Sequence, residues 1–192
     1  MNDGLSSYNR FLAGDNNGLS DLVEQYNSSL ILFINGFVND LFAAEDIAAD
    51  TFMEIFLKKG RFKENSSAKF KTWLFKIARN NAIDYLRKQS RTRTIAFDDV
   101  GEVAASPNSH GNPEDALLTI ERIAQLHRAM STLSPDYRQI LHLIYFEDMG
   151  YDNAGKVLKK TNRQIKNLAY NARKSLKAVL EKEGFSYEAL TN

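Results

Sequence analysis

Apolar side chains recur every three or four residues along most of this 192-residue chain, and this is the spacing of one face of an α-helix. Comparable series run through residues 22–37, 47–56, 117–130, 140–145 and 165–179. No run of alternating Val, Ile and Thr competes with them, so the sequence predicts an all-α fold. The clearest series is Phe70, Trp73, Leu74, Ile77, Ala78, Tyr85 and Leu86, and a later one predicts a buried face of Ile140, Leu141, Ile144 and Tyr145.

A segment of small and polar residues divides the helical pattern into two parts. Two of the three prolines, Pro107 and Pro113, lie in this stretch, which has no hydrophobic periodicity and is typical of a flexible linker. We therefore expect two small helical domains joined by a flexible linker. The expected boundaries are 1–93 for the first domain, 94–113 for the linker and 114–192 for the second domain.

The sign of the charge changes along the chain in step with this division. Residues 1–55 carry one basic and nine acidic side chains, whereas residues 56–93 carry twelve basic and two acidic ones. Residues 94–155 are acidic again, and residues 156–182 hold nine basic side chains against one acidic. Two cationic blocks of this kind indicate a protein that touches a polyanion at two places, although cations that merely solvate two amphipathic helices give the same pattern.

The second basic block has the outline of a helix-turn-helix. Ser134-Pro135-Asp136 predicts a helix start, the segment 149–152 breaks that helix, and a short helix is expected over about 152–159. Thr161 and Gln164 then form a capping-box sequence before a long amphipathic helix. Arg, Lys, Asn and Gln match base edges in the major groove and also phosphates. The polar candidates on this helix are Arg163, Gln164, Lys166, Asn167, Tyr170, Asn171 and Lys174.

The first basic block mixes cations with aromatic rings and amides, which suits single-stranded nucleic acid. Cations can follow a backbone while aromatic faces hold unstacked bases, but Phe70 and Trp73 fit a protein core as well because they lie on the apolar stripe. The candidates here are Phe62, Lys63, Asn65, Ser66, Lys69, Phe70, Lys71, Trp73, Phe75, Lys76, Arg79 and Asn80.

Several other classes of site are disfavoured. The chain has no Cys, which excludes disulfides and thiolate chemistry, and its three His are scattered. Glu45, Asp46 and Asp50 lie at helical spacing without a His partner, so we interpret them as surface carboxylates rather than as a metal site. Catalysis, a cofactor and membrane insertion are not expected. The polar start of the chain lacks a signal-peptide pattern, so we expect a cytoplasmic protein.

Motifs in both halves resemble those of bacterial RNA polymerase sigma factors of the small extracytoplasmic-function type. The segments 44–52 and 70–80, with its string Trp73-Leu74-Phe75-Lys76-Ile77-Ala78-Arg79-Asn80, are similar to the polymerase-docking and promoter-melting segments of that family. The segments 133–141 and 171–176 are similar to the opening and closing of its fourth conserved region. The resemblance covers about residues 18–93 and 115–182.

The resemblance implies a sigma factor that binds core RNA polymerase, recognises promoter DNA and helps to open it. Family members are commonly held by an anti-sigma protein, which adds a candidate partner. The implied polymerase contacts are Asp46, Ala49, Asp50 and Phe52. The implied contacts to the −10 element are Lys63, Asn65, Ser66, Lys69, Trp73, Lys76, Arg79 and Asn80. The implied contacts to the −35 element are Thr161, Asn162, Arg163, Gln164, Lys166, Asn167, Asn171 and Arg173.

The sequence departs from the family pattern in the first helix of the helix-turn-helix. Asn153-Ala154-Gly155 replaces the usual Glu-Ile-Ala-like triplet, and Lys159 stands where members often have Gly. Glycine inside a helix costs about 1 kcal/mol against Ala.

Three other functions stay open on the residues alone. A stand-alone helix-turn-helix repressor or activator with a sensing or dimerising first domain would bind duplex DNA without polymerase. A general RNA-binding or nucleoid protein would be expected to spread its basic residues more widely. An enzyme is the remaining alternative.

Overall fold

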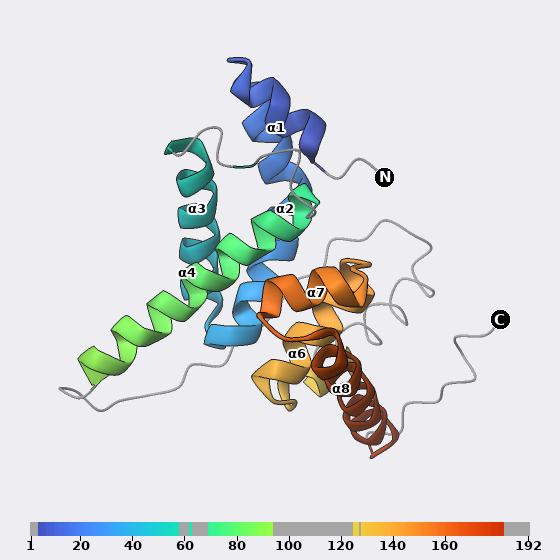
Figure 1. Cartoon of the computed structure of the whole chain (residues 1–192). Helices are drawn as coiled ribbons and strands as arrows, with labels where there is room; N and C mark the ends of the chain where they lie inside the picture. Colours follow the sequence, from blue (N-terminus) through green and yellow to red (C-terminus); the bar gives the residue numbers. More distant parts are fainter. Residues whose placement is uncertain (1–3, 58–61, 63–68, 94–124, 127, 183–192) are drawn as a thin grey trace, which may run out of the picture.

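The computed structural model describes residues 4–57, 62, 69–93, 125–126 and 128–182, and the regular structure within them is helical (Figure 1). The first part of the chain forms α1 (Leu5–Leu12), α2 (Asn17–Val38), α3 (Leu41–Leu57) and α4 (Phe70–Arg93). The second part forms α6 (Pro135–Leu141), the π-helical turn η1 (His142–Phe146), α7 (Tyr151–Leu158) and α8 (Asn162–Lys182). The predicted all-α fold is confirmed. The predicted linker, 94–113, and most of the helix predicted over 117–130 lie outside the described residues.

Helix α1 was not anticipated by the apolar series, which begins at residue 22. Its Tyr8 and Phe11 are completely buried, and the helix packs closely on α2. Gly18 makes this approach feasible, because a Cβ at that position would lie 2.3 Å from the backbone oxygen of Ser7. Helix α1 is therefore an integral part of the first domain.

Helix α4 is packed on two sides, against α3 on one and α7 on the other (Figure 1). Phe70, Leu74 and Ala78 are buried, as the apolar stripe predicts. The prediction that Phe75 is available to nucleic-acid bases is wrong in this structure, because its side chain is completely buried. Its ring centroid lies 5.1 Å from that of Phe33 in α2 and 6.3 Å from that of His142 in η1. Because His142 belongs to the second part of the chain, that part covers a side of α4 that the sequence of the first part alone predicts to be exposed.

The π-helical turn η1 changes which side chains of the second domain face inward. The Glu147 amide donates to the His142 carbonyl at 3.1 Å, a bond five residues long. This wider turn rotates His142 and Leu143 into the interior. The predicted burial of Tyr145 is wrong for the same reason, since a pattern of threes and fours assumes an unbroken α-helix and Tyr145 is 54% exposed.

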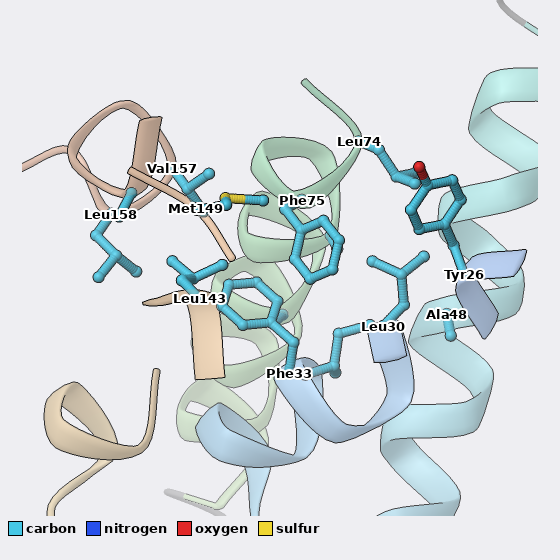
Figure 2. Close-up of a cluster of buried hydrophobic side chains, with 14 of the residues drawn as sticks. Tyr26, Leu30, Phe33, Ala48, Leu74, Phe75, Leu143, Met149, Val157 and Leu158 are labelled. Atoms are coloured by element: carbon cyan, nitrogen blue, oxygen red, sulfur yellow. The ribbon is translucent and has the colours of Figure 1, made fainter. Parts of the chain in front are cut away.

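One hydrophobic cluster runs through both parts of the chain. Figure 2 shows Phe33 of α2 and Phe75 of α4 facing Leu143 and Met149 of the second part, with Val157 of α7 beside them. All five of these side chains are buried. The two parts therefore lie against each other through apolar contacts.

Candidate nucleic-acid and polymerase interfaces

The start of α8 has the predicted capping box. The backbone N–H of Gln164 donates to Thr161 Oγ1 at 3.3 Å, and the backbone N–H of Thr161 donates to Gln164 Oε1 at 2.8 Å. These bonds satisfy two backbone donors that a helix start otherwise leaves unpaired. They also fix the direction of the helix at the end where base contact is predicted.

The side chains predicted to contact the −35 element share one exposed surface. The apolar stripe of α8 faces inward, with Ile165, Ala169 and Ala172 buried. Polar and cationic side chains cover the rest of the helix. All eight candidates are exposed: Thr161, Asn162, Arg163, Gln164, Lys166, Asn167, Asn171 and Arg173.

The turn between α7 and α8 explains Gly155, one of the departures from the family pattern, but not Lys159. Lys159 has φ 55°, the left-handed conformation that glycine adopts more easily. A Cβ on Gly155 would lie 2.8 Å from the backbone oxygen of Lys160, so an alanine there would collide with the turn. Gly155 thus allows a close approach, and α7 forms as a regular helix around it.

Two polar contacts join α7, α8 and α6 beside this turn. The Asn162 side-chain amide donates to the Asp152 carboxylate, so part of its hydrogen-bonding capacity is already used. Lys160 Nζ lies 3.0 Å from an oxygen of Asp136 near the start of α6. The three helices consequently present the start of α8 as a fixed element.

On α4 the candidates for the −10 element fall into two groups. Lys69 and Lys76 are exposed, whereas Trp73, Arg79 and Asn80 are half-buried. Lys63, Asn65 and Ser66 lie outside the described residues.

Arg79 of α4 is subject to the charge of an acidic residue of the second domain. Among the described residues its Nε is a buried donor without a hydrogen-bond partner. Burial lowers the pKa of Arg79, and the carboxylate of Asp136 on α6 opposes that effect. An acidic residue of the other domain therefore stabilises the charge of a side chain predicted to meet DNA.

Four aromatic rings gather where α1 meets the start of α4. The Tyr8 ring lies 5.0 Å from Phe70, 5.6 Å from Trp73 and 6.2 Å from Phe62, measured between centroids. Edge-to-face and tilted pairs at these distances are favourable. The sequence reasoning identified three of these rings and missed Tyr8, whose only signal was the amphipathic spacing of a short helix.

The outer face of α3 is acidic and apolar. Asp46, Ala49 and Asp50 are exposed, as a polymerase contact requires, and Glu45 lies beside them. Phe52 is only 6% exposed and belongs to the core, so its side chain is not part of this surface. The exposed apolar side chains that sequence reasoning missed are Phe42, Met53 and Leu57, at 80%, 55% and 70%.

Among the described residues, no group of three or more His, Asp or Glu is arranged to hold a metal ion. Glu45, Asp46 and Asp50 are separate exposed carboxylates of α3. None of the described helices combines the length and apolarity that crossing a membrane requires.

Each of the two parts of the chain matches a known protein family. Residues 22–92 match Sigma-70 region 2, and residues 123–176 match Sigma-70 region 4. The ECF RNA polymerase sigma factor SigM of Bacillus subtilis is 29% identical over 161 residues, covering 84% of this chain and 94% of SigM. The chain belongs to the extracytoplasmic-function sigma factors. SigW of the same organism is 25% identical, covering 87% of this sigma factor and 91% of SigW.

Solved structures share the fold of this sigma factor. The sigma factor RpoE of Bartonella quintana, in complex with the anti-sigma factor NepR, matches with a TM-score of 0.69 at 24% identity, covering 84% of this chain and 96% of RpoE. CnrH, in complex with the cytosolic domain of CnrY, matches with a TM-score of 0.63 at 19% identity, covering 94% and 99%. At these identities the likeness concerns the fold.

Proposed function

We propose that this sigma factor binds core RNA polymerase, selects promoters through two DNA contacts and helps to separate the strands at one of them. The capped helix α8 carries the proposal, because it exposes all eight polar and cationic candidates behind the short helix α7. The order of the two family matches, region 2 before region 4, supports it. We assign residues 1–93 to polymerase binding and the −10 element, 94–113 to a linker, and 114–192 to the −35 element.

The second domain reads the −35 element as a duplex. Its α8 is long enough to lie in the major groove, and its first two turns place Arg163, Lys166 and Asn167 on the exposed side. Arg163 and Asn167 are the best candidates for base edges, and Lys166 for a phosphate. Asn162 has a weaker claim to base contact, because its amide already donates to Asp152.

The first domain holds the parted strands of the −10 element. Base extraction costs a few kcal/mol per nucleotide, so a cationic surface with aromatic neighbours must offset that cost. Lys69 and Lys76 supply exposed cations, and the half-buried Trp73 supplies an aromatic face beside them. Lys63, Asn65 and Ser66, which lie outside the described residues, are candidates for the same DNA contact on the sequence alone.

Core polymerase contacts the outer face of α3. This face combines the carboxylates Asp46 and Asp50 with the exposed apolar side chains of Phe42, Met53 and Leu57. Charged rims around apolar centres are typical of protein interfaces. A sigma factor works where polymerase and chromosome are, so we place it in the cytoplasm. Two solved structures with the same fold are complexes with an anti-sigma factor or a partner's cytosolic domain, and an anti-sigma protein is a candidate partner here too.

Run-off transcription tests the function. Purified protein is added to core enzyme on genomic fragments, and a defined start site that requires the protein is expected. A gel shift with and without core enzyme separates the rival, a stand-alone helix-turn-helix regulator. Tight and specific duplex binding without polymerase, together with no gain of start sites, would replace the proposed function with that rival.

A further inference from the structure

A cavity of about 100 Å³ lies where α2 meets the second part of the chain. Its lining comes from α2, from the segment that holds Leu126 and Met130, and from α6 and η1. Because one enclosed water needs about 10–15 Å³ on this scale, the cavity holds roughly seven to ten non-hydrogen atoms. None of the described residues that line it is acidic, and none is assigned above to DNA or polymerase. The cavity is therefore a separate candidate site for a small molecule.

Arg138 of α6 brings a positive charge to this cavity. Its guanidinium donates from Nε and Nη2 to the Gly36 carbonyl, each at 3.3 Å, and from Nη1 to the Ser131 carbonyl at 2.9 Å. A guanidinium carries five N–H donors, so two donors remain after these three bonds. The neutral carbonyls hold the group in place, but they do not balance its charge.

No carboxylate among the described residues pairs with Arg138, and burial lowers the pKa of its guanidinium. Glu147, the buried acid of this part of the chain, is engaged elsewhere. Lys71 Nζ lies 2.5 Å from Glu147 Oε2, and the Ser29 hydroxyl donates to Oε1. Burial by itself would raise the pKa of this carboxyl, but hydrogen bonds from His142, Lys71 and Ser29 lower it to about 2. Arg138 is thus a half-buried cation that can accept an anion as its partner.

The other walls of the cavity suit a flat apolar body. The rings of His142 and Phe146 are stacked, with centroids 5.4 Å apart and 13° between their planes, and Met130 also lines the space. Leu32 and Phe146 are 39% and 50% exposed, so the cavity is open to solvent on their side. Asn35 adds one polar atom, because its side-chain oxygen is buried and has no hydrogen-bond partner among the described residues. A donor on a bound molecule would satisfy that oxygen.

We propose that this cavity binds a small aromatic carboxylate of the size of benzoate. The carboxylate accepts hydrogen bonds from the two unused N–H groups of Arg138, a pairing to which a guanidinium is well suited. The ring packs against the stacked His142 and Phe146, and a hydroxyl or amino group on the ring donates to Asn35. Inorganic phosphate and sulfate lack the apolar body that most of the lining requires. The inference does not depend on the proposed function, because none of these residues is assigned to DNA or polymerase.

Titration of the full-length protein with sodium benzoate tests the site. Calorimetry at neutral pH should detect a single site with a dissociation constant below about 1 mM, as expected for a ligand of about nine non-hydrogen atoms. Benzyl alcohol has a similar shape without the charge, and it should bind at least about tenfold more weakly because it lacks the charge-assisted bonds to Arg138. Among the three hydroxybenzoates, at least one should bind severalfold more tightly than benzoate, and Asn35→Leu should abolish that gain.

A matched pair of arginine variants locates the binding. Arg138→Gln removes the cation of the cavity and should weaken benzoate binding at least about tenfold. Arg128→Gln removes an exposed cation outside the cavity and should leave the affinity within about twofold. Circular dichroism checks that both variants are folded. Amide NMR of the wild type locates the ligand independently, and benzoate should shift the signals of Gly36, Ser131 and Phe146.

Each part of the inference can be overturned. Absence of saturable benzoate binding to the wild type would exclude the site. Equal losses in Arg138→Gln and Arg128→Gln, or shifts concentrated on the basic face of α8, would show a non-specific attraction of anions. Equal affinity for benzyl alcohol would exclude a carboxylate as the recognised group. If Arg138→Gln does not fold, the NMR shifts of the wild type decide. Run-off transcription tests the proposed function separately, so either result stands without the other.

Discussion

Lys71 and Glu147, 76 residues apart in the chain, form an ion pair at 2.5 Å across the boundary between the two domains. Lys71 lies in the first turn of α4, the helix that we assign to the −10 element. Glu147 lies just before the helix-turn-helix. The pair therefore links the two DNA-binding units.

Removing Lys71 should destabilise the protein by leaving a buried carboxylate short of partners. Lys71→Met is expected to lower the free energy of unfolding by about 2 kcal/mol, while the double variant Lys71→Met/Glu147→Gln should recover part of that loss. Urea unfolding of the two single variants and the double variant measures the coupling. Asp84→Asn serves as the control, since the exposed Asp84–Arg87 pair contributes less than about 1 kcal/mol. Equal losses at the two pairs would contradict the prediction.

Acid should weaken the wild type more than the Glu147→Gln variant. The pKa of Glu147 lies at about 2 in the folded protein, below its ordinary 4.5, so its stabilising effect is present above pH 4.5 and is lost as pH falls towards 2. The full effect corresponds to about 3 kcal/mol. Urea unfolding of both proteins between pH 6 and pH 3 should show the stability gap shrinking. A constant gap would exclude Glu147 as its source.

The turn between α7 and α8 can be tested by two opposite substitutions. Lys159→Gly should raise the free energy of unfolding by about 1 kcal/mol, because it relieves a left-handed backbone at a non-glycine residue. Gly155→Ala should lower it by about 1–3 kcal/mol through collision with the Lys160 carbonyl. Lys159→Ala separates the conformational effect from loss of charge. Thermal and urea unfolding supply both values, and a stabilising Gly155→Ala would show that helix propensity outweighs the collision.

Lys166 and the more distant Lys177 provide a matched pair on α8. Both are exposed, but Lys166 lies in the second turn and Lys177 three turns further on. Lys166→Ala should reduce the salt dependence of −35 DNA binding by the holoenzyme, with the slope of log K against log salt falling by about 1. Lys177→Ala should change it less. A larger effect at Lys177 would move the DNA contact to the other end of the helix.

Tyr8 should matter for the aromatic cluster at the start of α4. Tyr8→Ala removes a completely buried ring that packs on Phe70 and Trp73, and a loss of about 3 kcal/mol is expected. Tyr8→Phe keeps the ring and should cost much less. Urea unfolding followed by Trp73 fluorescence reports on stability and on the cluster together. Similar losses in both variants would assign the effect to the hydroxyl rather than to packing.

Local sequence patterns predicted several features of the fold correctly. The apolar stripes of α4 and α8 predicted their inward faces, and Thr161 with Gln164 predicted the cap that both hydrogen bonds confirm. These features depend on residues within a few positions of one another, as does the capping box itself. The exposed row of −35 candidates follows from the same periodicity.

Other features depend on packing between residues that are distant in the sequence. Glycine at position 155 appears costly from helix propensity alone, and it becomes necessary only because the Lys160 carbonyl lies against it. Phe75 is buried because Phe33 and His142, from distant segments, meet it. Tyr145 faces outward because the π-helical turn η1 interrupts the α-helical spacing of three and four residues on which its predicted burial depended. Local sequence patterns predicted the longer helices and their polar faces, but not α1 or the turn η1. Which helix faces meet depends on tertiary packing, because the energy of such contacts comes from residues that no local pattern brings together.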